Sequence, residues 1–174
     1  MSDKPKISKD FLFLTDLKSR EFVYNRNNSH SLAEVIAVSD IPYQPGIYLV
    51  YDFSKGELGD LLYVGKAGAN KYGKINTHQL PKRLLAVCYP PDKYLKDERY
   101  KNKFSTRKDV CRYDAWPKMM EIDNIDSIKI FCYFSKIINY QVSEDSNPLK
   151  LEAEIRKIYK SIPSWAKKYV TTFK

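Results

Sequence analysis

A predicted β-hairpin from Gly46 to Gly65 most constrains the fold of this chain. Both ends of this stretch are rich in β-branched and aromatic residues, whereas its middle is polar and carries two glycines. The pattern is typical of two antiparallel strands joined by a loop longer than a tight turn. Tyr48 and Tyr63 lie near its outer ends. Because side chains alternate along a strand, both phenols share one face only if the numbers of facing residues sum to an odd value.

The composition predicts one globular domain with a basic surface. The chain has 174 residues, of which 43% are hydrophobic and 29% charged, enough for a real core. The net charge of +9 favours nucleic acid or an anionic membrane surface, although a solvated basic surface is the alternative. No apolar run approaches the roughly 18 residues that span a bilayer, so we expect no membrane-spanning segment.

Cys88, Cys111 and Cys132 are the only cysteines, and none of them form a Cys-x-x-Cys pair. An odd count without this spacing argues against a disulfide framework and against a zinc site. The first residues also lack the apolar core of a signal peptide. We therefore expect three reduced, partly buried thiols in a cytoplasmic protein.

Several segments before and after the hairpin have local signatures. Apolar residues at 11–14 and 17 predict a segment that docks on the core. Ser31 and Glu34 fit a capping box that opens a short helix. After Gly65 comes a glycine- and lysine-rich loop whose Lys71 and Lys74 could face phosphates, although the order of residues is not that of a Walker A motif.

Two further helices and a strand follow from the pattern. Residues 80–87 read as a helix with Pro81 in its first turn and Arg83 beside its apolar side. Residues 127–134 alternate as a strand. A second helix begins at Asn147 and is stopped by Pro163, with a helical stripe at positions 151, 155, 158, 159 and 162. Glu152 and Glu154 flank this stripe on opposite sides, and periodicity alone does not choose between them.

Residues 93–118 are the most basic part of the chain, with nine Lys or Arg against four acids and with five aromatic residues interspersed. One interpretation is a DNA-contacting insertion, in which cations meet phosphates and aromatic rings meet bases. The other is a solvated excursion held by a few docking aromatics. The first interpretation predicts contacts to nucleic acid from Lys101, Lys103, Arg107 and Lys108.

Taken in order, these elements resemble the GIY-YIG nuclease superfamily. The family order is a hairpin with GIY and YIG, a helix with an arginine, a third strand, and a helix with a glutamate. Here these are Gly46-Ile47-Tyr48, Tyr63-Val64-Gly65, Arg83, residues 127–134 and Glu152, with Lys66 after the second motif. Residues 151–155, Leu-Glu-Ala-Glu-Ile, also look like the glutamate helix of the excision-repair nuclease domain, which favours Glu152. The resemblance covers residues 42–165.

The resemblance implies a role for each matching residue. Glu152 would hold one divalent ion per active site, Mg²⁺ or Mn²⁺, with substrate oxygens and waters completing the shell. Tyr48 would take the proton from water, which requires nearby positive charge because a free phenol titrates near ~10. Arg83 would brace the scissile phosphate, Tyr63 would orient the phosphate or the water, and Lys66 would supply positive charge.

The chain departs from the family at two places. Many members have His or Tyr four residues after the arginine, where this chain has Val87, and His78 or Tyr89 could take that place in space. Many also carry an asparagine beyond the glutamate helix, which residues 164–167 lack. These departures keep open a non-catalytic DNA-binding protein on the same fold and, as a weaker alternative, a basic RNA-binding module.

We therefore predict a single α/β (α+β) domain with a small, mainly antiparallel three-stranded sheet flanked by helices. Residues 1–41 would form an N-terminal extension packed on the core, and residues 42–174 the nuclease-like domain with a basic insertion at about 89–126. The expected function is metal-dependent hydrolysis of phosphodiester bonds in double-stranded DNA, as in type II restriction endonucleases. Homing, repair and phage nucleases are the alternatives. Without a separate DNA-binding module, specificity would come from insertions or from a homodimer on DNA.

Overall fold

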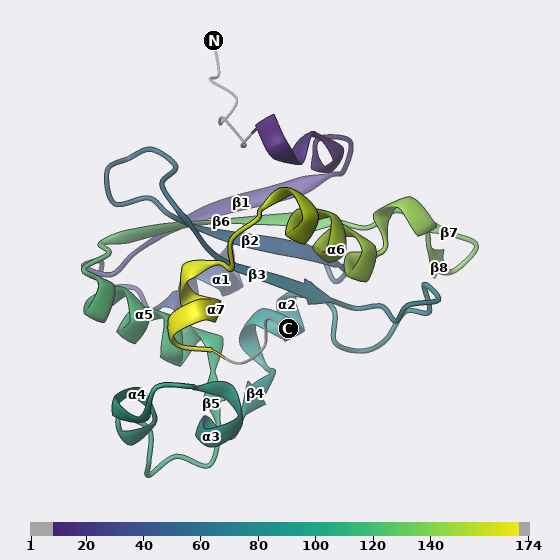
Figure 1. Ribbon diagram of the computed structural model, residues 1–174. Helices are drawn as coiled ribbons and strands as arrows, with labels where there is room; N and C mark the ends of the chain where they lie inside the picture. Colours follow the sequence, from purple (N-terminus) through teal and green to yellow (C-terminus); the bar gives the residue numbers. More distant parts are fainter. Residues whose placement is uncertain (1–8, 171–174) are drawn as a thin grey trace.

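The computed structural model describes residues 9–170, which form a mixed α/β fold around a four-stranded antiparallel sheet (Figure 1). Its strands are β1 (Ser19–Asn25), β2 (Gly46–Asp52), β3 (Leu61–Ala67) and β6 (Ser127–Phe134). Their order across the sheet is β1-β6-β2-β3, so β3 is an edge strand. None of the helices in the described part of the chain is long and apolar enough to cross a membrane.

Helices and short strands surround this sheet. The longer helices are α1 (Leu32–Val38), α2 (Leu80–Leu85), α5 (Arg112–Asp123) and α6 (Pro148–Ile158). The shorter α-helices are α3 (Pro91–Tyr94), α4 (Glu98–Asn102) and α7 (Ser164–Lys168), and η1 (Lys9–Leu14) and η2 (Glu144–Ser146) are 3₁₀ helices. Two small ribbons complete the fold, β4 (Cys88–Tyr89) with β5 (Val110–Cys111), and β7 (Ile137–Ile138) with β8 (Gln141–Val142).

The hairpin has the register that the two tyrosines require. Tyr48 faces Gly65 across the β2–β3 pair, and Val50 faces Tyr63, so both phenols lie on one face of the sheet. The register shifts only beyond these pairs, between Val50 and Tyr51. The predicted hairpin and its shared face are therefore confirmed, and no bulge is needed to bring the tyrosines together.

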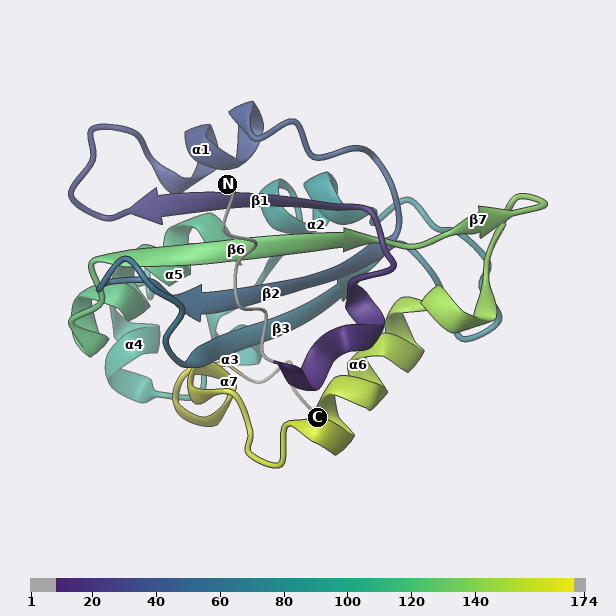
Figure 2. The same cartoon turned by 90° about the horizontal axis from the view of Figure 1, so that it is seen from above.

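Each face of the sheet buries its own apolar cluster (Figure 2). The larger cluster contains Tyr48 and Tyr63 and is covered by α1, α2, α5 and α7. The smaller one lies under η1 and α6, where Phe11, Leu14 and Leu151 are buried against the sheet. The predicted docking of residues 11–17 is thus confirmed, and the glutamate helix and the tyrosine pair occupy opposite faces.

The expectation of three strands is wrong, because residues 19–25 pair with β6 along its whole length. The apolar residues of this edge strand, Phe22, Val23 and Tyr24, follow one another without alternating with polar residues, and only Tyr24 is buried. The capping box of Ser31 and Glu34 is present, as predicted. The helix that opens at Asn147 also begins as predicted, but it ends at Ile158 rather than at Pro163, and Ile162 is exposed.

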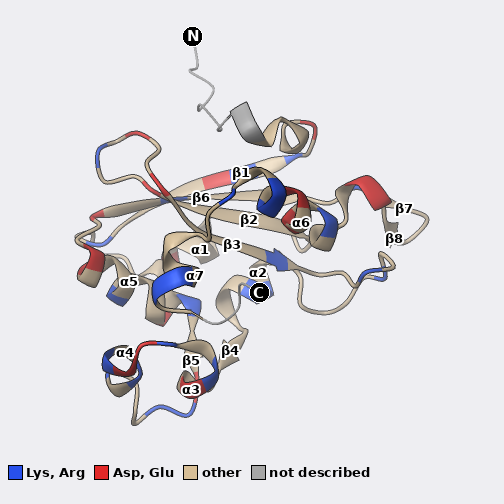
Figure 3. Ribbon diagram, in the orientation of Figure 1, with Lys and Arg blue, Asp and Glu red and all other residues tan. Residues whose placement is uncertain are grey.

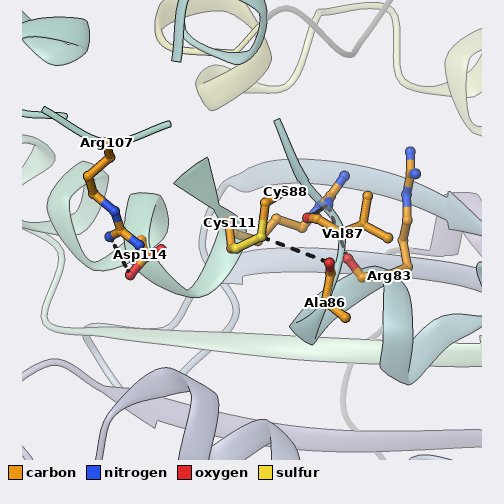
Figure 4. Close-up of a disulfide and its surroundings, with 8 residues drawn as sticks. Arg83, Ala86, Val87, Cys88, Arg107, Cys111 and Asp114 are labelled. Atoms are coloured by element: carbon orange, nitrogen blue, oxygen red, sulfur yellow. Dashed lines mark hydrogen bonds and ion pairs between the residues drawn. A yellow bond between two sulfur atoms is a disulfide. The ribbon is translucent and has the colours of Figure 1, made fainter. Parts of the chain in front are cut away.

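A lobe formed by residues 88–111 lies beyond α2 and α5 and is closed at its base by β4 and β5. Cys88 and Cys111 face each other in this ribbon and form a disulfide, shown in Figure 4. The expectation of three reduced thiols is therefore wrong for these two, while Cys132 is a free, buried cysteine. Sequence spacing did not reveal the pair, because the two cysteines meet only when the intervening residues fold back.

Candidate active site

Cationic side chains meet at the end of β3, around a cavity of about 380 Å³. Lys66 reaches it from β3, Arg83 from α2, and Lys71 and His78 from the loop that joins β3 to α2. This loop is the predicted glycine- and lysine-rich segment. The structure thus brings together three of the predicted site cations with His78, one of the two residues that could replace the family's His or Tyr.

Glu152 approaches the same edge of the sheet from α6 on the opposite side to the tyrosines. Its side chain pairs with Lys66, and Arg156 lies 3.4 Å away, one helical turn further on. Glu152 is only 5% exposed. The negative charge of its carboxylate is balanced by Lys66 and Arg156, whose side chains are partly in solvent. Glu154, by contrast, is exposed and pairs with Lys157 at 2.6 Å. Of the two acids that flank the helical stripe, Glu152 is the one that pairs with a residue lining the cavity.

Tyr48 lies in an aromatic stack on the other face. Its ring centroid is 6.0 Å from that of Tyr63 and 6.2 Å from that of Trp116, which in turn contacts Trp165. Gly65 makes room for this ring, since a Cβ there would overlap the distal atoms of the Tyr48 phenol. The Tyr48 hydroxyl is fully buried without a hydrogen-bond partner among the described residues. Burial raises the pKa of Tyr48, and the charges of Arg112 and Arg83 act in the lowering direction.

Arg112 is a central residue that the sequence did not single out. It is almost fully buried, and its guanidinium donates to the carbonyl oxygens of Arg83 (3.1 Å) and Val87 (3.4 Å). The same group lies over the rings of Tyr89 and Tyr94 at 5.7 and 5.9 Å. Arg112 therefore fixes the end of α2, the helix that carries Arg83. In the sequence it was one of nine cations of a basic segment, and nothing marked it as buried.

Val87 occupies the position at which the resemblance predicts a His or Tyr side chain. Val87 itself supplies a backbone carbonyl to Arg112. The ring of Tyr89 lies 5.7 Å from the Arg83 guanidinium carbon, so Tyr89 contacts the arginine that the resemblance places on the phosphate. Figure 4 shows Arg83 and Val87 beside the disulfide that anchors this turn. Both residues that could replace the family's His or Tyr are therefore near Arg83. His78 lines the same cavity, and the ring of Tyr89 faces the guanidinium.

The aromatic residues of the basic segment do not serve as a stacking surface. Tyr94, Tyr100, Phe104 and Trp116 are buried in the core, which contradicts their expected availability to bases. They are the docking aromatics of the alternative interpretation. Four of the cations predicted to contact nucleic acid belong to this segment: Lys101 pairs with Glu98 and Arg107 with Asp114, and Lys103, Arg107 and Lys108 are exposed. Acidic and basic residues are intermixed on α4 in Figure 3.

The donor set decides how a divalent ion could bind here. Residues 9–170 contain no group of three or more His, Cys, Asp or Glu side chains arranged to hold a metal by themselves. Mg²⁺ is commonly bound through one or two carboxylates, with waters and substrate phosphate oxygens as its other ligands. Glu152 fits the single-carboxylate form of such a site, provided that Lys66 releases it when a phosphate arrives.

No protein-family model matches this chain, and no curated protein or solved structure is detectably similar to it. The resemblance to GIY-YIG nucleases therefore rests on the sequence motifs alone.

Proposed function

We propose that this protein is a metal-dependent DNA endonuclease that hydrolyses phosphodiester bonds, with a site-specific, restriction-endonuclease-like action. The observation that carries the proposal is the pairing of buried Glu152 with Lys66 at the cavity that Arg83 also lines. A buried carboxylate held by cations beside further free cationic groups is suited to exchange its partner for a metal and a phosphate.

The residues of the chain have distinct parts in this proposal. Arg83 and Lys66 neutralise the scissile phosphate, and the planar guanidinium of Arg83 also orients it. Glu152 holds the ion, which supplies Lewis-acid stabilisation of the phosphate when bound. Tyr48 is the candidate general base: as a phenolate it would accept the proton of the attacking water, a form that the charges of Arg112 and Arg83 favour and that burial, the larger effect on the pKa of Tyr48, opposes. Tyr63, stacked on Tyr48, keeps this phenol in place.

The test is incubation of the purified protein with plasmid DNA in Mg²⁺ or in EDTA. We expect discrete bands with Mg²⁺ alone, whereas a smear would indicate a non-specific nuclease of repair or phage type. Glu152→Ala is expected to abolish cutting while DNA binding is retained, because its partners Lys66 and Arg156 are partly solvated and can be rehydrated. Glu154→Ala, on the exposed side of the same helix, is the matched control. Full cutting by Glu152→Ala would refute this assignment.

A second candidate is a non-catalytic DNA-binding protein on the same fold. It is favoured by the complete burial of the Tyr48 hydroxyl and by the direction in which burial moves its pKa. In that case the cations around the cavity bind phosphate without hydrolysis. A mobility shift without cutting in Mg²⁺ or Mn²⁺ would support this candidate over the endonuclease.

A further inference from the structure

A small two-stranded arm projects beyond the end of the main sheet, next to the candidate active site. The arm comprises residues 137–142, in which β7 and β8 are joined through Asn139 and Tyr140. Figures 1 and 2 show it reaching past the ends of β2 and β3. Its tip is apolar and open to solvent, since Tyr140 is 94% exposed and Ile138 59% exposed.

The turn of the arm is conformationally costly. Both Asn139 and Tyr140 have positive φ, at 49° and 62°, as the two central residues of a type I′ turn do. Asparagine is well suited to the first position, but glycine is the favoured residue at the second. A tyrosine at this position is disfavoured by the positive φ, and the burial of its ring does not offset this cost because the ring is exposed. A strained, exposed aromatic residue of this kind points to a role in binding.

The base of the arm is built onto the loop that lines the active-site cavity. The Val142 amide donates to the carbonyl of Gly73 at 2.9 Å, and a Cβ on Gly73 would lie 2.5 Å from the Val142 carbonyl oxygen. Lys71 lines both the active-site cavity and a second cavity of about 330 Å³ against the arm. The two cavities therefore share Lys71, and the arm borders the second of them through Gln141 and Val142.

The charges around the arm indicate the chemistry of its partner. Lys71 and Lys74 are exposed and have no acidic partner within residues 9–170. Lys136 and Lys150 also lie near its base, where they pair with Asp145 and Glu144. An apolar tip framed by cations matches a polymer with phosphates outside and flat apolar groups inside. Duplex DNA has this arrangement, and proteins that kink it insert apolar side chains between base pairs.

We propose that the arm inserts into duplex DNA, with Tyr140 wedged at a base step and with Lys71 and Lys74 on the flanking phosphates. This inference rests on the proposed function, and it places the DNA contact at the arm rather than on the lobe of residues 88–111. The arm would set the duplex against the cavity that contains Lys66 and Arg83.

The test uses the full chain, in EDTA, with a short duplex that carries 2-aminopurine as a reporter of unstacking. Tyr140→Gly removes the ring and relieves the backbone, so the thermal midpoint is expected to be unchanged or higher. Its affinity for the duplex is expected to fall about 5- to 100-fold, the scale of one base–aromatic contact, and the fluorescence rise to disappear. Ile138→Ser should also weaken binding. Ile162→Ser, at a residue that is 55% exposed and lies beyond the C-terminal end of α6, is its matched control.

Three results would overturn the inference. Tyr140→Gly could bind and unstack the duplex like the wild type. Alanine at Lys101, Lys103, Arg107 and Lys108 together could remove binding that Tyr140→Gly leaves intact. Sedimentation could show that Tyr140→Gly abolishes a dimer without changing DNA affinity, which would make the arm a contact between copies. A wild type that binds no duplex refutes both proposals, whereas binding without cutting refutes the endonuclease alone.

Discussion

Replacing Gly65 by alanine is expected to destabilise the protein by overlapping the ring of Tyr48. A Cβ at this position would lie 2.5 Å from Cε1 of Tyr48 and closer still to its Cζ and hydroxyl oxygen. Carbon atoms in contact are about 3.5–4.0 Å apart, so the ring must move by about 1 Å or more. It has no free space, because Tyr63 and Trp116 pack against it. Overpacking of this kind costs about 3 kcal/mol, at the upper end of its usual range.

A double-mutant cycle separates this overlap from other effects of the substitution. Tyr48→Leu lacks Cε1, Cζ and the hydroxyl, so Gly65→Ala is expected to cost about 0.5 kcal/mol or less in that background, with a coupling of about 3 kcal/mol. Tyr48→Phe keeps Cε1 and Cζ and is the control in which the full cost remains. Urea unfolding measures the free energies, and the single variant should lose about 6–12 °C in thermal midpoint. An equal cost of Gly65→Ala in the wild-type and Tyr48→Leu backgrounds would refute the reasoning.

Two further predictions concern the aromatic stack and the lobe. Tyr48→Phe is expected to lower the cleavage rate by about two to four orders of magnitude if the phenol is the general base. The stability of the protein should be retained or raised, because the buried hydroxyl has no hydrogen-bond partner among the described residues. Unchanged turnover in a plasmid-nicking assay would exclude this role. Reduction of the disulfide, or its removal in the Cys88→Ser/Cys111→Ser double variant, is expected to lower the free energy of unfolding by about 3 kcal/mol, because the bond closes a loop with a sequence separation of 23 residues. Calorimetry with and without reductant checks this, and an unchanged midpoint would contradict it.

The parts of the fold that the sequence predicted are those with strong local signals. The capping box at Ser31, the alternation of residues 127–134 and the Asn147-Pro148 helix start depend on neighbours in the chain. The hairpin register could be stated as a condition on parity, because two tyrosines on one face permit only half of the registers. The structure has the register that meets this condition.

The parts that the sequence did not predict depend on contacts between distant residues. Strand β1 is paired through its backbone while most of its side chains remain in solvent, and its apolar residues Phe22, Val23 and Tyr24 are contiguous, so it lacks the alternation that marks a half-buried strand. Arg112 is buried only because the rings of Tyr89 and Tyr94 and the carbonyls of α2 surround it. The sequence pattern of the lobe's aromatic residues is the same whether their rings stack on bases or pack in a core. Only their burial in the structure distinguishes these two roles.

The location of the two tryptophans gives the protein an internal optical reporter. The sequence contains two tryptophans, and Trp116 and Trp165 are both fully buried with their ring centroids 6.0 Å apart. Trp116 also contacts both Tyr48 and Tyr63, so excitation energy absorbed by these phenols is transferred readily to the indole. Emission from the native chain therefore originates beside the residues proposed to activate water, and the coupled indoles should dominate the near-ultraviolet circular dichroism. Any ligand that shifts the tyrosine pair can be detected without a label.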